Sequence, residues 1–140
     1  MIYLWDSDTF SWWQRAPGTF QSRLDRLGSE DAVALSAVTV HEALRGRLAY
    51  VAQARDERAY RHALAALVTA VGALSSWPIL PYTTEAAARF ARLRSGRGSR
   101  GMADLRIAAT AIEAGAVLVT RNAAYYSDLP GLTAENWVDG

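Results

Sequence analysis

The chain has 140 residues, of which 15 are basic and 14 acidic, and 51% are hydrophobic. This length suits a single compact domain spanning residues 1–140, and the balanced charge excludes both a disordered tail and a strongly basic nucleic-acid wrapper. With no Cys and only two His, a disulfide framework, a thiolate metal site and a histidine cage are excluded, so any metal must bind carboxylates.

The chain shows no targeting or membrane signal. Residues 1–6 form no basic leader, and no uncharged apolar stretch approaches the roughly 18 residues that a membrane helix needs. We therefore expect no signal peptide, no membrane contact and a cytoplasmic protein.

Short apolar runs alternate with helical stretches along the chain. Four buried strands are predicted, at residues 2–5, 32–38, 79–82 and 116–120. Helices are predicted from near Thr9, over an Ala-rich hairpin within 39–75, over 84–93, and over 102–114 with a stop at Gly115. This alternation indicates an α/β fold, a three-layer α/β/α sandwich around a parallel sheet of four or five strands.

Acidic and amide side chains stand where these strands end. Asp6 closes the first strand, Glu42 follows the second, and Asp104 lies near the start of the helix that leads to the fourth, which Asn122 and Asp128 follow. Ligands bind outside the carboxyl ends of the strands in such sheets, so we expect these side chains to share one crevice. Clustered carboxylates suit Mg²⁺ or Mn²⁺ and the hydrolysis of a phosphodiester.

Each acid also has a structural interpretation. Asp6 or Asp8 could cap the first helix, and Asp104 could stabilise a helix dipole from the first turn. Thr39 and Glu42 fit a capping box, in which the glutamate returns to the backbone N–H of Thr39. The combination of three acids at the expected ends of their elements favours a shared metal site over three separate helix caps.

Two further features could contact a nucleic acid. The glycine-rich, basic segment 95–101 is either a surface loop or a phosphate-binding lip formed by Arg97 and Arg100. Trp12 and Trp13 could stack an unpaired base, or they could belong to the core and an interface.

The sequence resembles the PIN-domain toxins of the VapBC class along nearly its whole length. The resemblance is carried by the opening MIYLWDSDT and by the segments SAVTVHEALRG, GMADLRIAA, LVTRN, LPGL and ENW. It implies a PIN-like α/β/α fold and the toxin component of a type II toxin–antitoxin system. The implied activity is that of a Mg²⁺- or Mn²⁺-dependent endoribonuclease.

The same resemblance implies the site. The best-defined acids of the family fall on Asp6, Glu42 and Asp104, as catalytic groups and metal ligands, and Arg97, Arg100 and Arg121 are then candidates for binding RNA. The family's further acid is replaced here by Tyr125. A second ion would consequently be held by Asn122 through water, held by Asp128, or bound weakly.

The expected partners also follow from the resemblance. We expect RNA as substrate, a homodimer, and a cognate antitoxin that binds along the hairpin between Arg45 and Leu74. Packing within the core is the alternative explanation of the apolar residues on that hairpin.

Two other functions compete with the nuclease. Residues 6–9, DSDT, also resemble the nucleophile loop of haloacid-dehalogenase-type phosphohydrolases, but the chain has no Lys and no late Asp-Asp pair. A catalytically weak PIN module that acts by binding RNA or a partner is the second alternative. An Asp6→Asn variant that still binds RNA but loses toxicity would distinguish a nuclease from such a module.

Overall fold

The computed structural model describes residues 1–96, 98 and 101–139. One parallel sheet contains five strands in the order β3-β2-β1-β4-β5. The strands are β1 (Ile2–Trp5), β2 (Ala32–Ser36), β3 (Ile79–Leu80), β4 (Val117–Val119) and β5 (Thr133–Glu135). The prediction of an α/β/α sandwich with a parallel sheet is confirmed, and the four predicted strands are present. Three are shorter than predicted: β2 ends at Ser36 because α3 begins at Ala37, β3 ends at Leu80, and β4 spans only Val117–Val119.

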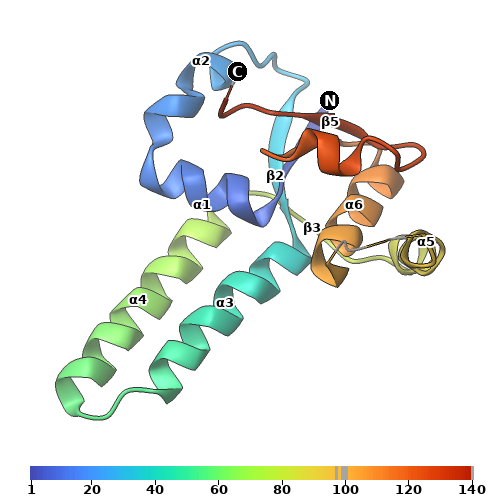
Figure 1. The fold of residues 1–140 in the computed structure, drawn as a ribbon. Coiled ribbons are helices and arrows are strands. Elements are labelled where there is room, and N and C mark those ends of the chain that lie inside the picture. The colour runs from blue at the N-terminus through green and yellow to red at the C-terminus, as the bar shows by residue number, and fades with distance from the viewer. Residues whose placement is uncertain (97, 99–100, 140) are drawn as a thin grey trace.

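Helices cover both faces of the sheet (Figure 1). The α-helices are α1 (Ser7–Arg15), α2 (Gln21–Leu24), α3 (Ala37–Ala52), α4 (Glu57–Ser75), α5 (Thr84–Arg94) and α6 (Met102–Ala114). Two 3-10 helices, η1 and η2, span Pro17–Phe20 and Ala123–Tyr126. Within this described part of the chain, none of the helices combines the length and the apolar character that crossing a bilayer requires.

Successive residues of a strand belong to two separate hydrophobic cores, because side chains alternate between the two faces of a sheet. Leu4, Ala34 and Leu118 pack against α5 and α6 on one face. Trp5 and Val119 point to the other face, where an aromatic cluster joins α1, η1 and the end of α4. The strands are therefore covered on both sides, which explains why they read as continuous apolar runs.

Local signals set several element boundaries. Gly115 ends α6 with φ 63° and ψ 29°, a left-handed conformation that favours glycine, as predicted. The first helix begins at Ser7, two residues before the expected Thr9, because Asp6 itself is the N-cap. Strand β1 therefore passes directly into α1 through one aspartate.

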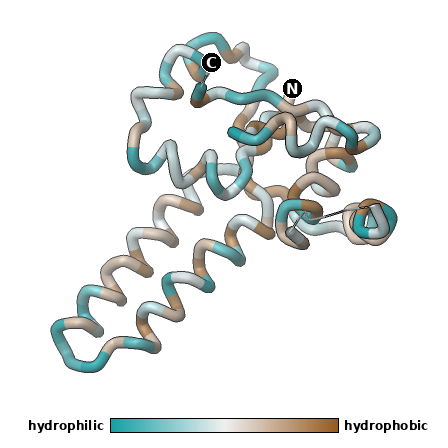
Figure 2. Tube along the Cα trace, in the orientation of Figure 1, coloured by the Kyte–Doolittle hydropathy of each residue, from teal (hydrophilic) through white to brown (hydrophobic). Residues whose placement is uncertain are grey.

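The helices α3 and α4 form a hairpin that projects from the body of the molecule (Figure 1). Hydrophobic residues recur along the length of both helices (Figure 2). On α4, four of them are exposed at spacings of four, four and three residues, which places them on one helical face: Tyr60, Leu64, Val68 and Val71. This exposed face, which we call the α4 stripe, is not covered by any described part of the chain.

Candidate active site

Asp6 stands at the carboxyl end of the central strand, beside the end of β4. Its side chain accepts a hydrogen bond from the backbone N–H of Thr9 at 2.8 Å, and only 7% of the residue is exposed. Burial raises the pKa of the Asp6 carboxyl above its ordinary value, and hydrogen bonds with Thr120 and Thr9 oppose this shift. A carboxylate in this position is costly unless a positive charge compensates it.

The backbone around Asp6 is held to the neighbouring strand. The backbone N–H of Asp6 donates to the carbonyl oxygen of Val119 at 3.1 Å, and the hydroxyl of Thr9 donates to the same oxygen at 3.0 Å. These bonds tie the start of α1 to the end of β4, so the position of the Asp6 carboxyl is fixed by two strands rather than by a mobile loop.

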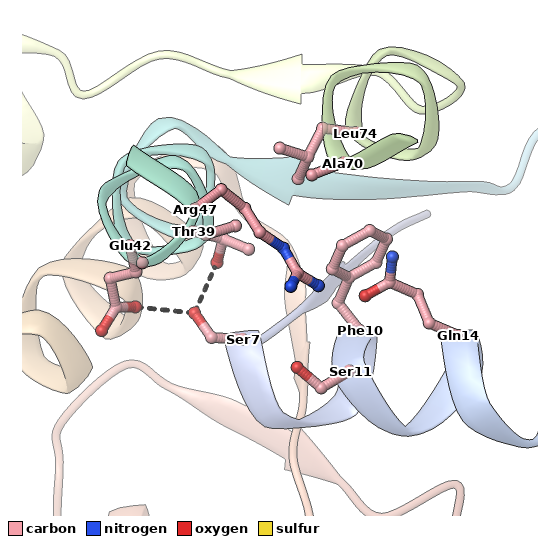
Figure 3. Close-up of a pocket in the computed structure, with 11 residues that line it drawn as sticks. Ser7, Phe10, Ser11, Gln14, Thr39, Glu42, Arg47, Ala70 and Leu74 are labelled. Carbon is pink, nitrogen blue, oxygen red and sulfur yellow. Dashed lines mark hydrogen bonds between the residues drawn. The ribbon is translucent and has the colours of Figure 1, made fainter. Parts of the chain in front are cut away.

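Glu42 lies on the second turn of α3 and is held by a neighbouring serine. The hydroxyl of Ser7 donates to Oε1 of Glu42 at 2.6 Å, as Figure 3 shows. The predicted capping box is wrong: α3 begins at Ala37, and its N-cap is Ser36, whose side chain accepts from the N–H of Thr39 at 3.0 Å. Because β2 runs straight into the helix, Thr39 is already helical and Glu42 is free to face α1.

Three hydroxyls form a directed chain that ends on Glu42. Ser36 donates to Oγ1 of Thr39 at 3.3 Å, and the hydroxyls of Thr39 and Ser7 are 3.1 Å apart. An ionised Glu42 can only accept, so Ser7 must donate to it and accept from Thr39. The chain therefore fixes one glutamate oxygen and leaves the other for a ligand.

Removing the Ser7 hydroxyl should loosen Glu42 without unfolding the protein. We expect Ser7→Ala to lower the cleavage rate at limiting Mg²⁺ by about tenfold, the usual effect of losing a group that orients a metal ligand. The Mg²⁺ dependence of cleavage and the melting temperature measure this. Ser75→Ala, which removes a hydroxyl bonded only to the backbone of Gly72, should change neither the rate nor its Mg²⁺ dependence.

Asp104 lies in the first turn of α6, half-buried, where α6 meets α3. Burial and the negative charge of Glu42 both raise the pKa of the Asp104 carboxyl, while hydrogen bonds with Tyr125 and Tyr126 lower it. In the described part of the chain, Asp6, Glu42 and Asp104 form no ion pair with a basic side chain.

Tyr125 contributes to the site although it is not acidic. Its hydroxyl accepts from the backbone N–H of Gly101 at 3.1 Å and donates to Oδ2 of Asp104 at 3.4 Å. Sequence reasoning treated Tyr125 only as a missing acid. The structure shows that the tyrosine instead connects η2 to the first turn of α6.

The remaining predicted site residues are distributed differently. Asn122 is exposed after β4, and its backbone N–H donates to Oγ1 of Thr120 at 3.1 Å. Asp128 is exposed and lines a separate cavity with Arg89 and Arg92, and none of the three acids lines that cavity. Arg97 and Arg100 lie outside the described residues.

Arg121 and the tryptophan pair are engaged within the protein. Arg121 lies over the ring of Trp12 at 4.4 Å, and its guanidinium is 3.6 Å from Asp8 and 3.9 Å from Asp139. Trp13 packs against Trp5 and other aromatic rings of the core. Trp13 therefore belongs to the aromatic core, and Trp12 is a half-buried ring in contact with Arg121.

The acids suit a hydrated divalent cation better than a closed cage. Across residues 1–96, 98 and 101–139, no group of three or more Asp, Glu or His side chains is gathered tightly enough to hold one ion alone. Mg²⁺ typically binds one or two carboxylates and keeps several waters. Asp6 and Asp104, whose pKa values are raised and which form no ion pair with a described basic side chain, fit that mode of binding.

Two cavities open on either side of Glu42. One, of about 400 Å³, lies between α1, α3 and α4 and is shown in Figure 3. The other, of about 660 Å³, lies between α3 and α6 and is lined by His41, Arg45 and Arg106 among others. Glu42 is the one of the three acids that lines both cavities, with Arg47 in the first and His41, Arg45 and Arg106 in the second.

Comparison with known proteins agrees with this geometry. The family model described as "PIN domain" matches residues 3–130. A search of curated proteins found no match.

Solved structures share the fold along the whole chain. VapBC-1 from nontypeable Haemophilus influenzae is 20% identical over 98% of both chains with a TM-score of 0.74. DNA-bound VapBC from Salmonella typhimurium is 24% identical over 98% of both chains with a TM-score of 0.75. FitAcB from Neisseria gonorrhoeae is 26% identical over 98% of both chains with a TM-score of 0.65. The parallel sheet, the acids at its carboxyl edge and the family match over nearly the whole sequence lead to one conclusion: the chain belongs to the PIN domain family.

Proposed function

We propose that this protein is the toxin of a type II toxin–antitoxin pair and that it acts as a Mg²⁺- or Mn²⁺-dependent endoribonuclease. The observation that carries the proposal is a set of three carboxylates at the carboxyl edge of the sheet, Asp6, Glu42 and Asp104, that form no ion pair with any basic side chain among the described residues. The resemblance to VapBC structures supports the toxin role. The family match favours a nuclease over the phosphohydrolase alternative.

Each acid and its hydrogen-bond partner would have a distinct role in binding the cation. Asp6, fixed by α1 and β4, and Asp104, at the start of α6, would hold the cation, with Glu42 binding it directly or through water. When bound, the cation would supply positive charge for the phosphate and lower the pKa of an attacking water. Ser7 and Thr39 would keep Glu42 oriented, and Tyr125 would do the same for Asp104.

The exposed surface of the hairpin supports a protein partner. The α4 stripe is exposed and apolar, and such patches mark protein interaction sites. We propose that a cognate antitoxin covers the hairpin between Arg45 and Leu74, that the chain forms a homodimer, and that it acts on RNA in the cytoplasm.

Cleavage of labelled total bacterial RNA tests the activity. We expect discrete products with Mg²⁺ or Mn²⁺ and none with chelator. Products that persist in chelator would contradict the metal mechanism. RNA binding without cleavage in any metal would instead favour a binding module.

Restoring an acid at position 125 should strengthen metal binding. We expect Tyr125→Asp to lower the Mg²⁺ concentration needed for half-maximal cleavage by about tenfold, because divalent-ion affinity rises with the number of charged ligands. Tyr125→Asn removes the same ring without adding charge and is the matched control. Equal Mg²⁺ dependence in the two variants would show that position 125 does not face the cation.

A further inference from the structure

The cavity between α1, α3 and α4 begins at the proposed site and extends away from it. Glu42, Ser7 and Thr39 form its inner end, and Phe10, Ala70 and Leu74 are apolar lining residues. These three apolar residues are almost fully buried, with exposed fractions of 3%, 7% and 3%. The cavity lining therefore combines buried apolar side chains with one of the three acids, Glu42.

Unused hydrogen-bond donors stand at the outer part of this cavity. Arg47 of α3 and Gln14 of α1 line it from opposite sides (Figure 3). Both are exposed, and neither forms an ion pair or a side-chain hydrogen bond with any residue that the structure describes. Ser11 adds a further hydroxyl to the lining. A ligand with a flat apolar face and polar edges would match both parts of this lining.

Gly46 keeps the cavity open at a cost to its own helix. It lies inside α3 and lines the cavity, although glycine disfavours a helix interior. A Cβ at this position would meet nothing within 4 Å, so no close packing requires the glycine. The absence of a side chain at this position leaves the cavity space next to Gly46 empty.

We propose that this cavity is the subsite for the nucleobase next to the scissile phosphate of a single-stranded RNA. The inference rests on the proposed nuclease function, because Glu42 belongs to both the acids and the cavity wall. Single-stranded RNA is read through splayed bases, which stack on apolar surfaces and present polar edges. The volume of about 400 Å³ is within the range of small-ligand sites. A base held there would fix which phosphate lies at the acids.

Filling the cavity tests the proposal. Gly46→Leu adds a side chain into it, whereas Gly72→Leu makes the same change inside α4, where a Cβ also meets nothing within 4 Å and where no lining residue is altered. Both variants should melt a few degrees higher than the wild type, because leucine favours a helix more than glycine does. Arg47→Ala is a second variant. It removes an exposed hydrogen-bond donor from the cavity lining, so its effect does not depend on how a new side chain packs.

The RNA probe is a pool of single-stranded RNA of random sequence. Its cut sites are sequenced to find which base is preferred at each position next to the cleaved phosphate. An oligonucleotide of the preferred sequence is then compared with one that lacks the base at that position. We expect Gly46→Leu, and not Gly72→Leu, to flatten the preference and to lower kcat/KM by roughly 10- to 100-fold, the effect of losing one stacked base. The oligonucleotide that lacks this base should be cleaved by the wild type more slowly by the same factor. Gly46→Leu should cleave the two oligonucleotides at the same rate.

Failure of the subsite and failure of the nuclease are distinguishable. If wild type cleaves and Gly46→Leu keeps the same preference and rate, the subsite is wrong while the nuclease stands. If Gly46→Leu affects only binding of the antitoxin, the cavity belongs to that protein and the proposal is overturned. If wild type binds the pool without cleaving it, the nuclease fails, and equal Kd values for the two leucine variants would also overturn the subsite. A wild type that neither binds nor cleaves the pool overturns both.

Discussion

Replacing Asp6 with asparagine is expected to lower the rate of RNA cleavage by roughly a thousandfold, because a cation at this site contributes several kcal/mol to stabilising the transition state. Asparagine is as good an N-cap as aspartate, so α1 should keep its start. The change removes the charge and little else. Single-turnover cleavage of a labelled RNA at saturating Mg²⁺ measures the loss.

Asp56 offers a matched control for this experiment. It caps α4 with the same geometry, accepting from the N–H of Ala59 at 2.8 Å, but it is exposed at the tip of the hairpin. Asp56→Asn should cleave RNA at the wild-type rate. Similar losses in both variants would mean that helix capping, rather than charge at the sheet edge, explains the effect of Asp6→Asn.

The same substitution should stabilise the metal-free protein at neutral pH. The pKa of Asp6 is raised by burial above 3.8, so the folded state binds the proton more tightly than the unfolded state. Stability is therefore greatest below the unfolded value and falls as pH rises through the folded pKa. Asp6→Asn removes this penalty, so the metal-free variant is expected to melt at a higher temperature than the wild type at neutral pH.

Mg²⁺ should reverse the order of stability. Binding to the folded state alone adds about 2.7 kcal/mol when the ion is at a hundred times its Kd, and only the wild type retains the full ligand set. Thermal melts of both proteins from about pH 4 to neutral, with Mg²⁺ and with chelator, measure the two effects. A wild-type melt that Mg²⁺ leaves unchanged would contradict a cation site at Asp6. An Asp6→Asn variant that is less stable than the wild type without metal would contradict the destabilising effect of the buried charge.

The sequence predicted the parts of the fold that depend on continuous burial. Strands β1, β2 and β4 are buried on both faces and read as apolar runs, and Gly115 marked the end of α6 correctly. Strand β5 was not located, because its three residues, Thr133–Glu135, lie at a sheet edge and are exposed or half-buried. A short polar strand has no pattern that distinguishes it from a loop.

The candidate site was predicted only in part for a similar reason. The acids could be found because strand ends are visible in the sequence. The hydroxyl chain from Ser36 through Thr39 and Ser7 could not, because it depends on how α1 packs against α3. The bridge from Tyr125 to Asp104 likewise joins residues that are brought together only by the fold. The roles of Asp6, Glu42 and Asp104 stay predictions until the variants are assayed.

The projecting hairpin has a consequence for the lifetime of the free protein. Its two helices contact mainly each other, and the turn that joins them carries the exposed Arg55. Segments with few tertiary contacts open at free energies well below that of global unfolding, so amide exchange should be fastest towards this tip. We expect a protease that cuts after arginine to reach the chain at Arg55. A protein bound along the hairpin would close that route, so the survival of this chain in a cell would depend on its partner.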